Sequence, residues 1–259
     1  YGHGLSEIRL GKALANYPRD QYVLASKVGR LLREPVEQIS PTIFKNVPKL
    51  EPIFDYSRDA VLASIDESLS RLNVDYLDVV HVHDPDDHED WAINEAFPTL
   101  IQLRDEGVVK AVGCGTNQTK SLTRFVHEVD LDCLLLAGRY TVLDNTSGSE
   151  LLQLCHERNI GVILGGIFNS GLLANPEKNK TFDYVDASPE IVQKAQELSE
   201  LARSHGVSLA HAAVQFGLRH PGVSSIVIGA RTSIEIDQDL SYASEIIPDA
   251  FWDALQTLR

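Results

Sequence analysis

Methionine is absent from this 259-residue sequence, and cysteine and tryptophan are scarce, with three and two residues. The spacing of Cys114, Cys133 and Cys155 is not that of a metal site, and Cys114 and Cys133 lie in apolar stretches. This pattern argues against a disulfide framework and predicts reduced thiols in a cytoplasmic protein. The missing methionine and the opening at Tyr1 lead us to expect that the sequence is part of a longer one.

Long apolar runs and clustered positive charge are also missing. No apolar stretch approaches the roughly 18 residues of a membrane-spanning helix, and the net charge is −14 without a basic stripe. Nucleic acid and membrane are therefore not expected partners. Neither Gly113-Cys114-Gly115 nor Gly165-Gly166 completes the glycine fingerprint of a Rossmann domain. We expect a small-molecule substrate and a monomeric or homodimeric protein.

The stretch from Tyr76 to His88 contains a dense group of histidine and aspartate residues. It begins as a short β-branched apolar run and ends in His and Asp residues interrupted by Pro85. This is typical of a buried parallel strand that delivers polar side chains to the rim of a site. His81 and His83 are two residues apart and therefore share a face of the strand. His83 is thus a candidate catalytic residue, although a buried histidine satisfied by its neighbours would have the same pattern.

Strand-like segments alternate with segments of helical periodicity, and no hairpin signal interrupts them. We expect strands at 21–27, at the segment ending at His83, and at 108–114, 133–137, 161–164 and 225–228. We expect helices at 59–73, 94–106, 119–129, 149–158, 188–205 and 209–219. The alternation predicts a parallel α/β sheet. Polar or glycine residues follow nearly every strand, which favours a single (β/α)8 TIM barrel over 1–259 rather than an open doubly wound sheet.

Six units do not close such a barrel, so we expect two further strands before Tyr1. Near that end, Ser6 is expected to cap a helix whose apolar face is Ile8, Leu10 and Leu14. The residues 22–25 are expected to be buried. The proline-rich segment 28–56 is predicted to be a long substrate or lid loop, because loops of this length inside compact domains are usually functional.

At these strand exits the sequence resembles the aldo-keto reductase family over essentially its full length. The residues that carry the resemblance are Tyr1-Gly2-x-Gly4-x-Ser6-Glu7, Ser26-Lys27, Tyr76-Leu77-Asp78 followed by His83-x-Pro85, Gly113, Gly171-Leu172-Leu173 and Gly229-Ala230-Arg231. The family uses an Asp, Tyr, Lys and His tetrad, which implies catalytic roles for Tyr1, Lys27 and His83. The family aspartate falls before the tyrosine, so we expect it to precede Tyr1.

The chemistry of this triad agrees with the resemblance. A tyrosine hydroxyl ionises near pH 10, too high for a general base at neutrality. A nearby ammonium group such as that of Lys27 would stabilise the phenolate and lower its pKa. A neutral His83 could then orient the oxygen of the substrate.

The sequence most resembles the subgroup that contains aldose 1-dehydrogenases and pyridoxal 4-dehydrogenase, through 79–88, 135–141 and 168–171. The resemblance implies oxidation of a cyclic hemiacetal, an aldose or pyridoxal, to a lactone. It also implies an NAD or NADP cofactor. The residues expected to bind it are Asn117 at the carboxamide, Phe168 as an apolar wall, Asn169, Ser170, Gly171 and Leu172 at the diphosphate, and Gly229, Arg231 and Glu235 after the last strand.

NAD is the expected cofactor, because Glu235 stands where NADP-specific members have a basic residue for the 2′-phosphate. Arg231 complicates this expectation, since it could bind that phosphate or stack on adenine. Substrate selection is expected from Phe54, Trp91, Arg139 and Tyr140. The polar groups nearest His83 favour a sugar over a pyridine ring.

Three other functions remain open. A general NADPH carbonyl reductase would use the same residues. A metal-dependent hydrolase could use His81 and His83 as ligands, but the later histidines fall on expected helices. A barrel that binds a cofactor and regulates a partner without catalysis would lack the complete tetrad.

Overall fold

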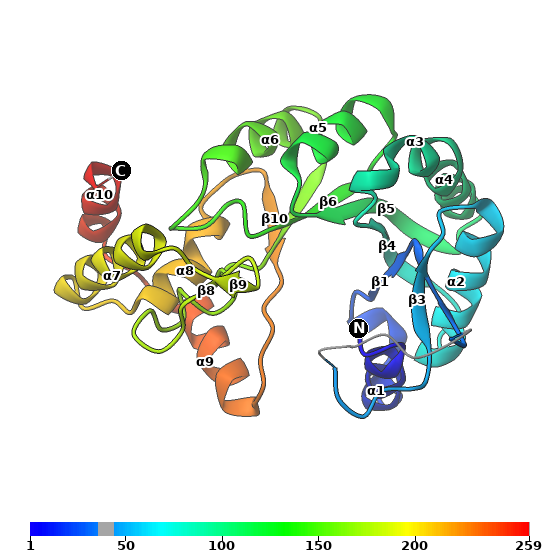
Figure 1. Ribbon diagram of the computed structural model, residues 1–259, viewed down its shortest axis with the longest axis horizontal. Helices are drawn as coiled ribbons and strands as arrows, with labels where there is room; N and C mark the ends of the chain where they lie inside the picture. The colour runs from blue at the N-terminus through cyan, green and yellow to red at the C-terminus, as the bar shows by residue number, and fades with distance from the viewer. Residues whose placement is uncertain (36–43, 259) are drawn as a thin grey trace. The chain divides into compact units, whose positions relative to one another are not determined.

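A computed structural model describes residues 1–35 and 44–258 of the chain (Figure 1). The residues 36–43 and 259 lie outside the described part, and so does the middle of the predicted lid. The chain forms two compact units, 1–134 and 135–259. Among the helices that the structure describes, none is long and apolar enough to cross a membrane.

The first unit contains three parallel strands, two of which carry Lys27 and His83, whereas Tyr1 lies before the first helix. Its helices and strands are α1 (Leu5–Leu14), β1 (Ala25–Val28), β2 (Arg30–Arg33), β3 (Glu51–Phe54), α2 (Arg58–Leu72), β4 (Leu77–His83), α3 (Glu89–Trp91), α4 (Phe97–Asp105), β5 (Val109–Thr116), α5 (Thr119–Glu128) and the first residues of β6 (Cys133–Ala137). The strands β1, β4 and β5 are hydrogen-bonded in that order. The predicted alternation of strand and helix is confirmed here.

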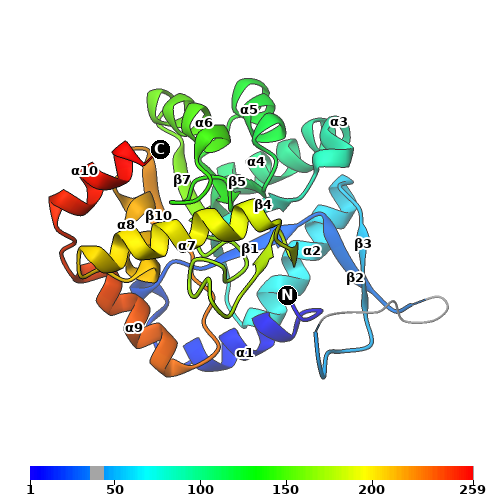
Figure 2. The same ribbon diagram turned by 60° about the vertical axis from the view of Figure 1, so that its left-hand side comes forward.

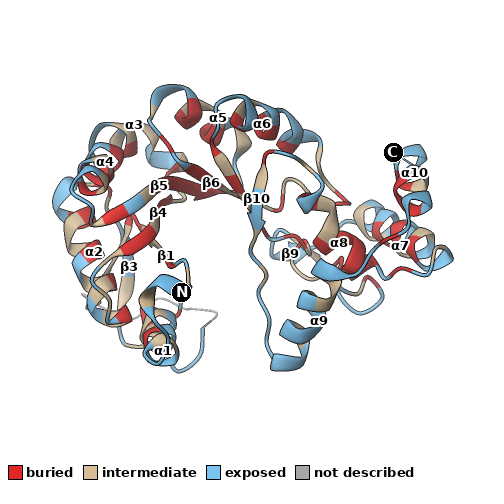
Figure 3. Cartoon of the chain, turned by 180° about the vertical axis from the view of Figure 1, so that it is seen from behind, coloured by how far each residue is buried: buried red, intermediate tan, exposed pale blue. Residues whose placement is uncertain are grey.

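The register of these strands places the polar residues at their carboxyl ends side by side. Lys27 of β1 pairs with His81 of β4, and His81 pairs with Gly113 of β5. His83, two residues further along β4, pairs with Gly115. Most of β4 is buried (Figure 3), as expected for a parallel strand covered on both faces. Lys27 and His83 therefore emerge from adjacent strands at the same end of the sheet.

An antiparallel hairpin occupies the described part of the predicted 28–56 loop. β2 and β3 pair along their whole length, with Arg30 opposite Phe54 (Figure 2). Gly29 has a φ of 100°, and a Cβ there would lie 2.3 Å from the Tyr56 ring, so only glycine fits. The sequence shows no hairpin signal here because residues 34–50 separate the two strands, and the recognised hairpin signals belong to connections of a few residues.

Two expectations near the N-terminal end are wrong. Ser6 does not cap α1: the helix begins after Gly4, which has a φ of 85° and provides no side-chain cap. Leu10 of the expected apolar face is exposed, while Gly11 packs against the backbone of Leu72. Of the residues 22–25, only Leu24 is buried. Tyr22 and Val23 precede β1, which begins only at Ala25, so they do not take part in the sheet.

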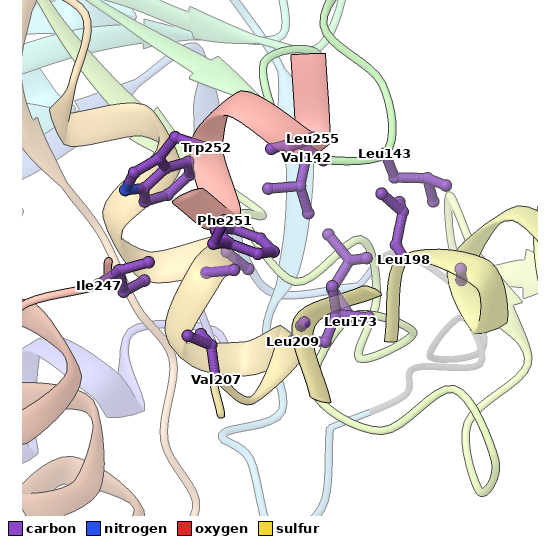
Figure 4. Packing of buried hydrophobic residues seen from close by; sticks show 14 of the residues in the cluster. Val142, Leu143, Leu173, Leu198, Val207, Leu209, Ile247, Phe251, Trp252 and Leu255 are labelled. Carbon is purple, nitrogen blue, oxygen red and sulfur yellow. The ribbon is translucent and has the colours of Figure 1, made fainter. Parts of the chain in front are cut away.

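The second unit contains the remaining strands and a separate hydrophobic core. Its elements are the rest of β6, α6 (Thr146–Glu157), β7 (Gly161–Gly165), β8 (Thr181–Phe182), β9 (Val185–Asp186), α7 (Pro189–Ser204), α8 (Leu209–Leu218), β10 (Val223–Ile226), α9 (Ser233–Ser244) and α10 (Asp249–Thr257). β10 pairs with β7 in parallel. Phe251 and Trp252 of α10 pack with Leu198 and Leu209 in the core (Figure 4). Ser188 caps α7 by accepting a hydrogen bond from the Ile191 amide.

Candidate functional site

The three candidate catalytic residues line one cavity in the first unit. The cavity has a volume of about 260 Å³, and its lining includes Tyr1, Lys27, Arg30, Phe44 and His83. The structure thus brings together three side chains that are up to 82 positions apart in the sequence.

Tyr1 lies between a cation and two rings. The Lys27 ammonium nitrogen is 3.8 Å from the centroid of the Tyr1 ring. The Tyr1 and His83 rings meet edge to face with centroids 6.2 Å apart, and Phe44 lies 6.4 Å away on another side. Edge-to-face contact and a cation over the ring face are both attractive arrangements for an aromatic ring. These contacts orient Tyr1 although its side chain remains exposed.

The acidity of the Tyr1 phenol differs from the sequence expectation. Desolvation and then the Asp84 carboxylate raise the pKa of Tyr1, and Arg30 only partly opposes them. The expected lowering by Lys27 is not found, because the Lys27 ammonium lies over the ring face. Burial lowers the pKa of Lys27 itself to about 8. Tyr1 therefore holds its proton at neutral pH in this arrangement.

His83 is neutral, as the sequence interpretation requires. Burial, followed by the charges of Arg30 and Lys27, lowers the pKa of His83 to about 3. His81 behaves similarly: burial, followed by Lys27, lowers its pKa to about 4. Both nitrogens of the His81 ring are buried without a hydrogen-bond partner among the described residues. His81 is therefore a buried, neutral ring on the same strand face as His83.

The strand exit that carries His83 is held by a tyrosine that the sequence interpretation missed. The Tyr56 hydroxyl lies 2.8 Å from the carbonyl oxygens of both His83 and Asp84. The Tyr56 ring packs on Gly29, and the Asp55 amide donates to the Gly29 carbonyl oxygen. Tyr56 thereby connects the ends of the two strands that carry Lys27 and His83. Two features of the sequence could have indicated this contact: Gly29 stands directly after β1, and the aromatic residue Tyr56 stands directly before Ser57, the N-cap of α2.

Two of the expected substrate residues join an aromatic cluster beside this exit. Phe54 and Trp91 each contact Tyr56, with ring centroids 6.4 and 5.8 Å apart, and both contact His88. Phe54 is 48% exposed, and the Arg30 guanidinium lies 5.0 Å from its ring centroid. This arrangement leaves an apolar ring face beside polar groups.

The other two expected substrate residues lie in the second unit. Arg139 forms a two-pronged ion pair with Asp183, at 2.7 and 3.0 Å. Tyr140 stacks on Phe216 with ring centroids 5.0 Å apart. The Arg139 guanidinium is therefore already engaged, a contact that the sequence did not indicate.

The loop 168–172 follows β7 and contains consecutive left-handed residues. The φ angles of Asn169, Ser170 and Gly171 are 44°, 58° and 94°. The amides of Asn169, Gly171 and Leu172 donate to carbonyl oxygens of the same loop or of the residues just before it. These three amides are therefore already engaged in hydrogen bonds of the chain. Phe168 packs against the core of the second unit.

The remaining expected cofactor residues are near the surface. Asn117 follows β5, and its side-chain oxygen accepts a hydrogen bond from Gln118. Arg231 pairs with Glu235 at 2.8 Å, and its guanidinium is 90% exposed. A Cβ added to Gly229 would meet nothing within 4 Å. The polar groups of Arg231 and Glu235 are thus paired with each other at the surface of the second unit.

Metal ligation was the alternative interpretation of His81 and His83. Within residues 1–35 and 44–258, no three His, Cys, Asp or Glu side chains form a group that could hold a metal ion. The three cysteines are free and buried. The hydrolase alternative therefore has no donor set in the described part of the chain.

Comparison with known proteins gives a consistent result. The model of the Aldo/keto reductase family matches residues 1–259. The chain is 38% identical to D-threo-aldose 1-dehydrogenase from Pseudomonas sp, over 100% of this chain and 81% of that protein. It is also 38% identical to pyridoxal 4-dehydrogenase from Microbacterium luteolum, over 99% and 81%. Identity to L-galactose dehydrogenase from Arabidopsis thaliana is 28%, over 95% and 72%.

Solved structures share the fold at lower identity. An aldo-keto reductase from Bacillus halodurans in its holo form matches with a TM-score of 0.77 and 22% identity, covering 100% of this chain and 79% of that one. The glycerol dehydrogenase of Gluconobacter oxydans matches with a TM-score of 0.75 and 22% identity, over 98% and 76%. At these identities the likeness establishes the barrel fold alone.

Proposed function

Because the chain belongs to the aldo/keto reductase family of oxidoreductases, we propose that it is a nicotinamide-dependent dehydrogenase that oxidises a cyclic hemiacetal to a lactone. The observation that carries this proposal is the convergence of Tyr1, Lys27 and His83 on one cavity. The two relatives at 38% identity, a D-threo-aldose 1-dehydrogenase and a pyridoxal 4-dehydrogenase, support the substrate class. An aldose ring and the ring form of pyridoxal are both cyclic hemiacetals.

The reaction requires a proton and a hydride to leave one hemiacetal centre. A bound nicotinamide supplies the hydride acceptor. Tyr1, as phenolate, takes the proton from the anomeric hydroxyl while the C–H bond of the same carbon breaks, and the carbon becomes the lactone carbonyl. Neutral His83 donates a hydrogen bond that holds the reacting oxygen, and the Lys27 ammonium over the Tyr1 ring orients the phenol.

The chain offers donors of the right chemistry for a dinucleotide. Asn117 is assigned to the carboxamide, Arg231 to the adenine, and Glu235 to a ribose hydroxyl. A carboxylate at Glu235 repels a 2′-phosphate and accepts a hydrogen bond from a hydroxyl, so NAD is preferred over NADP. Gly229 and the loop residues Phe168, Asn169, Ser170, Gly171 and Leu172 complete the assigned set. The amides of Asn169, Gly171 and Leu172 already donate to carbonyl oxygens and the Asn169 and Leu172 side chains are buried, so the assignment of this loop rests on the resemblance alone.

Sugars are the proposed substrates rather than pyridoxal. Phe54 provides an exposed apolar ring face next to Arg30 and Asp84. A sugar needs this combination of an apolar face and several hydrogen-bonding groups, whereas a pyridine ring needs an aromatic slot. Trp91 supports that ring face through Tyr56, and Arg139 and Tyr140 are assigned to substrate selection.

Substrate-dependent formation of reduced nicotinamide tests the proposal. Purified protein is assayed with NAD and L-fucose, L-galactose, D-arabinose or pyridoxal, and the product is trapped and identified as lactone or open-chain acid. We expect reduction of NAD with at least one sugar and a lactone as the first product. A reaction only with open-chain aldehydes, and only in the reductive direction, contradicts the hemiacetal assignment.

A general carbonyl reductase is the second candidate function. It is favoured by the raised pKa of Tyr1, because a protonated phenol is ready to act as a general acid toward a carbonyl oxygen at neutral pH. The substrate assay distinguishes the two functions, since a reductase consumes reduced cofactor with simple aldehydes.

A further inference from the structure

The residue after His83 turns its carboxylate back toward the His83 ring. Asp84 has a φ of 43°, in the left-handed region that Asp tolerates better than most residues. Its amide donates to the Gly115 carbonyl oxygen at 3.0 Å, and its own carbonyl accepts from Tyr56 at 2.8 Å. The result is a separation of 3.4 Å between Asp84 Oδ2 and His83 Nε2. An unfavourable backbone conformation is thus maintained next to the candidate catalytic ring.

Arg30 approaches the same carboxylate oxygen from β2. Its terminal nitrogen forms an ion pair with Asp84 Oδ2, and its guanidinium packs over Phe54. The two side chains are 36% and 37% exposed, so the pair contributes little to the stability of the fold. The position of this ion pair beside His83 is therefore better explained by its influence on the protonation of the His83 imidazole.

The two charges act on the imidazole in opposite directions. A carboxylate at this distance favours the protonated ring, whereas a guanidinium disfavours it. The Arg30 charge is, after burial, the largest influence that lowers the pKa of His83. A neutral imidazole carries one N–H, and an acceptor facing one nitrogen determines which nitrogen carries it. Asp84 Oδ2 faces Nε2.

We propose that Asp84 and Arg30 are positioning residues for His83. The Asp84 carboxylate selects the tautomer with hydrogen on Nε2, and the Arg30 guanidinium cancels the carboxylate charge so that the ring stays neutral. The inference rests on the proposed function: at 3.4 Å the carboxylate biases the tautomer through its charge without holding the Nε2–H in a short hydrogen bond, so the same N–H can donate to the reacting oxygen. The proposal explains why the negatively charged Asp84 and the positively charged Arg30 both lie beside the His83 ring, which must stay neutral.

Other charged and titratable groups also surround this pair. Lys27 on β1, His81 on β4 and Tyr1 act on the His83 site, and Asp86 acts on Asp84. These groups stay unchanged when Arg30 or Asp84 is substituted. A shift in His83 caused by either substitution can thus be attributed to the substituted residue.

Nitrogen-15 NMR of the His83 ring tests the inference, with the signal assigned by its loss in His83→Asn. In the wild-type protein we expect a neutral ring with hydrogen on Nε2 at pH 7. Asp84→Asn should shift the ring toward the Nδ1–H tautomer and lower kcat on the order of tenfold or more, because one oriented donor is lost. Arg30→Gln should raise the pKa of His83 by at least about one unit, while Arg30→Lys should leave the ring neutral.

Arg33→Gln is the matched control, because it removes the same charge from β2 at a residue that pairs with Glu67 at 2.7 Å. It should leave the His83 tautomer and pKa unchanged. If Asp84→Asn and Arg30→Gln behave like this control, the inference is overturned whatever the activity. The NMR readout needs no turnover, so a failure of the inference is distinguishable from a failure of the proposed function. If Arg30→Gln does not fold, Asp84→Asn alone decides through the tautomer.

Discussion

The Lys27 ammonium nitrogen lies 3.8 Å from the centroid of the Tyr1 ring, over the face of the ring. A cation at this position is attracted by the ring electrons and orients the side chain. Burial lowers the pKa of Lys27 to about 8, and burial together with the Asp84 carboxylate raises the pKa of the Tyr1 phenol, which keeps its proton at neutral pH. Both the reaction and the stability of the fold should therefore depend on pH through these two residues.

Replacing Tyr1 by phenylalanine should abolish turnover. The hydroxyl moves the proton, so we expect kcat to fall to about 1% or less of wild type, in line with the usual contribution of a positioned acid or base. Cofactor affinity, measured by fluorescence titration, should be nearly unchanged because the hydroxyl does not hold the dinucleotide. Tyr17→Phe is the control, since Tyr17 is an exposed tyrosine outside the cavity. Substantial activity in Tyr1→Phe would refute the assignment.

The oxidation rate should rise with pH. The pKa of Tyr1 is raised above its ordinary value, so the phenolate fraction at neutrality is small and grows about tenfold per pH unit. Between about pH 6 and pH 7.5 Lys27 stays largely charged, because its pKa is about 8. The slope of log kcat for oxidation should therefore be close to one in this range. A flat profile, with the chemical step shown to be rate-limiting by a deuterated substrate, would contradict the role of Tyr1.

Replacing Lys27 by methionine should stabilise the fold at neutral pH. The folded pKa of about 8 lies below the ordinary value of 10.5, so folding disfavours the charged form, and this penalty is fully present below pH 8. Its removal should raise the free energy of unfolding by about 1–3 kcal/mol at pH 7. The gain should shrink by about half near pH 9.5, because the folded lysine is then neutral and the unfolded lysine loses its proton more easily as the pH approaches 10.5.

Urea unfolding at the two pH values measures this effect. Lys12→Met is the matched control, because Lys12 is an exposed lysine on α1 and should show no such pH-dependent gain. A loss of stability in Lys27→Met at pH 7 would mean that the attraction to Tyr1 outweighs the desolvation of the ammonium.

Replacing Tyr56 by phenylalanine should loosen the exit of β4. The hydroxyl lies 2.8 Å from the carbonyl oxygens of His83 and Asp84, and both lose this donor. We expect the free energy of unfolding to fall by about 1–3 kcal/mol, the usual cost of leaving buried polar groups unpaired. We also expect kcat to fall, because His83 and Asp84 lose their fixed orientation. Unfolding and kinetics that match wild type would show that water or another group replaces the hydroxyl.

Replacing Glu235 by arginine should shift the cofactor preference toward NADP. Glu235 now pairs with Arg231 at 2.8 Å and presents negative charge, which repels a 2′-phosphate. The substitution removes that repulsion, adds a cation and frees Arg231 to bind the phosphate. The ratio of kcat/KM for NAD and NADP is the measurement. Asp237→Arg, an equal charge change on the same helix, should have little effect; equal shifts in both variants would indicate only a general electrostatic influence.

The sequence by itself determined the family, the barrel and the identity of the three side chains around the cavity. The periodicity of strands and helices is local, and the exits of parallel strands face the same end of a sheet, so His83 and Lys27 could be placed together from the residue pattern alone. The strand β6 was predicted with its observed limits, Cys133–Ala137. The resemblance to aldose and pyridoxal dehydrogenases is confirmed by the two relatives at 38% identity.

Only the tertiary structure decided how these side chains influence one another. Tyr56 reaches His83 across 27 positions, and Arg30 reaches Asp84 across 54. No local pattern encodes such contacts, because they depend on a hairpin and a strand exit meeting in space. The same reason explains why the pKa of Tyr1 was predicted in the wrong direction. The same sequence is compatible with a Lys27 ammonium over the Tyr1 ring and with one beside the Tyr1 hydroxyl. The pKa of Tyr1 depends on which position is taken, on burial and on every charge nearby.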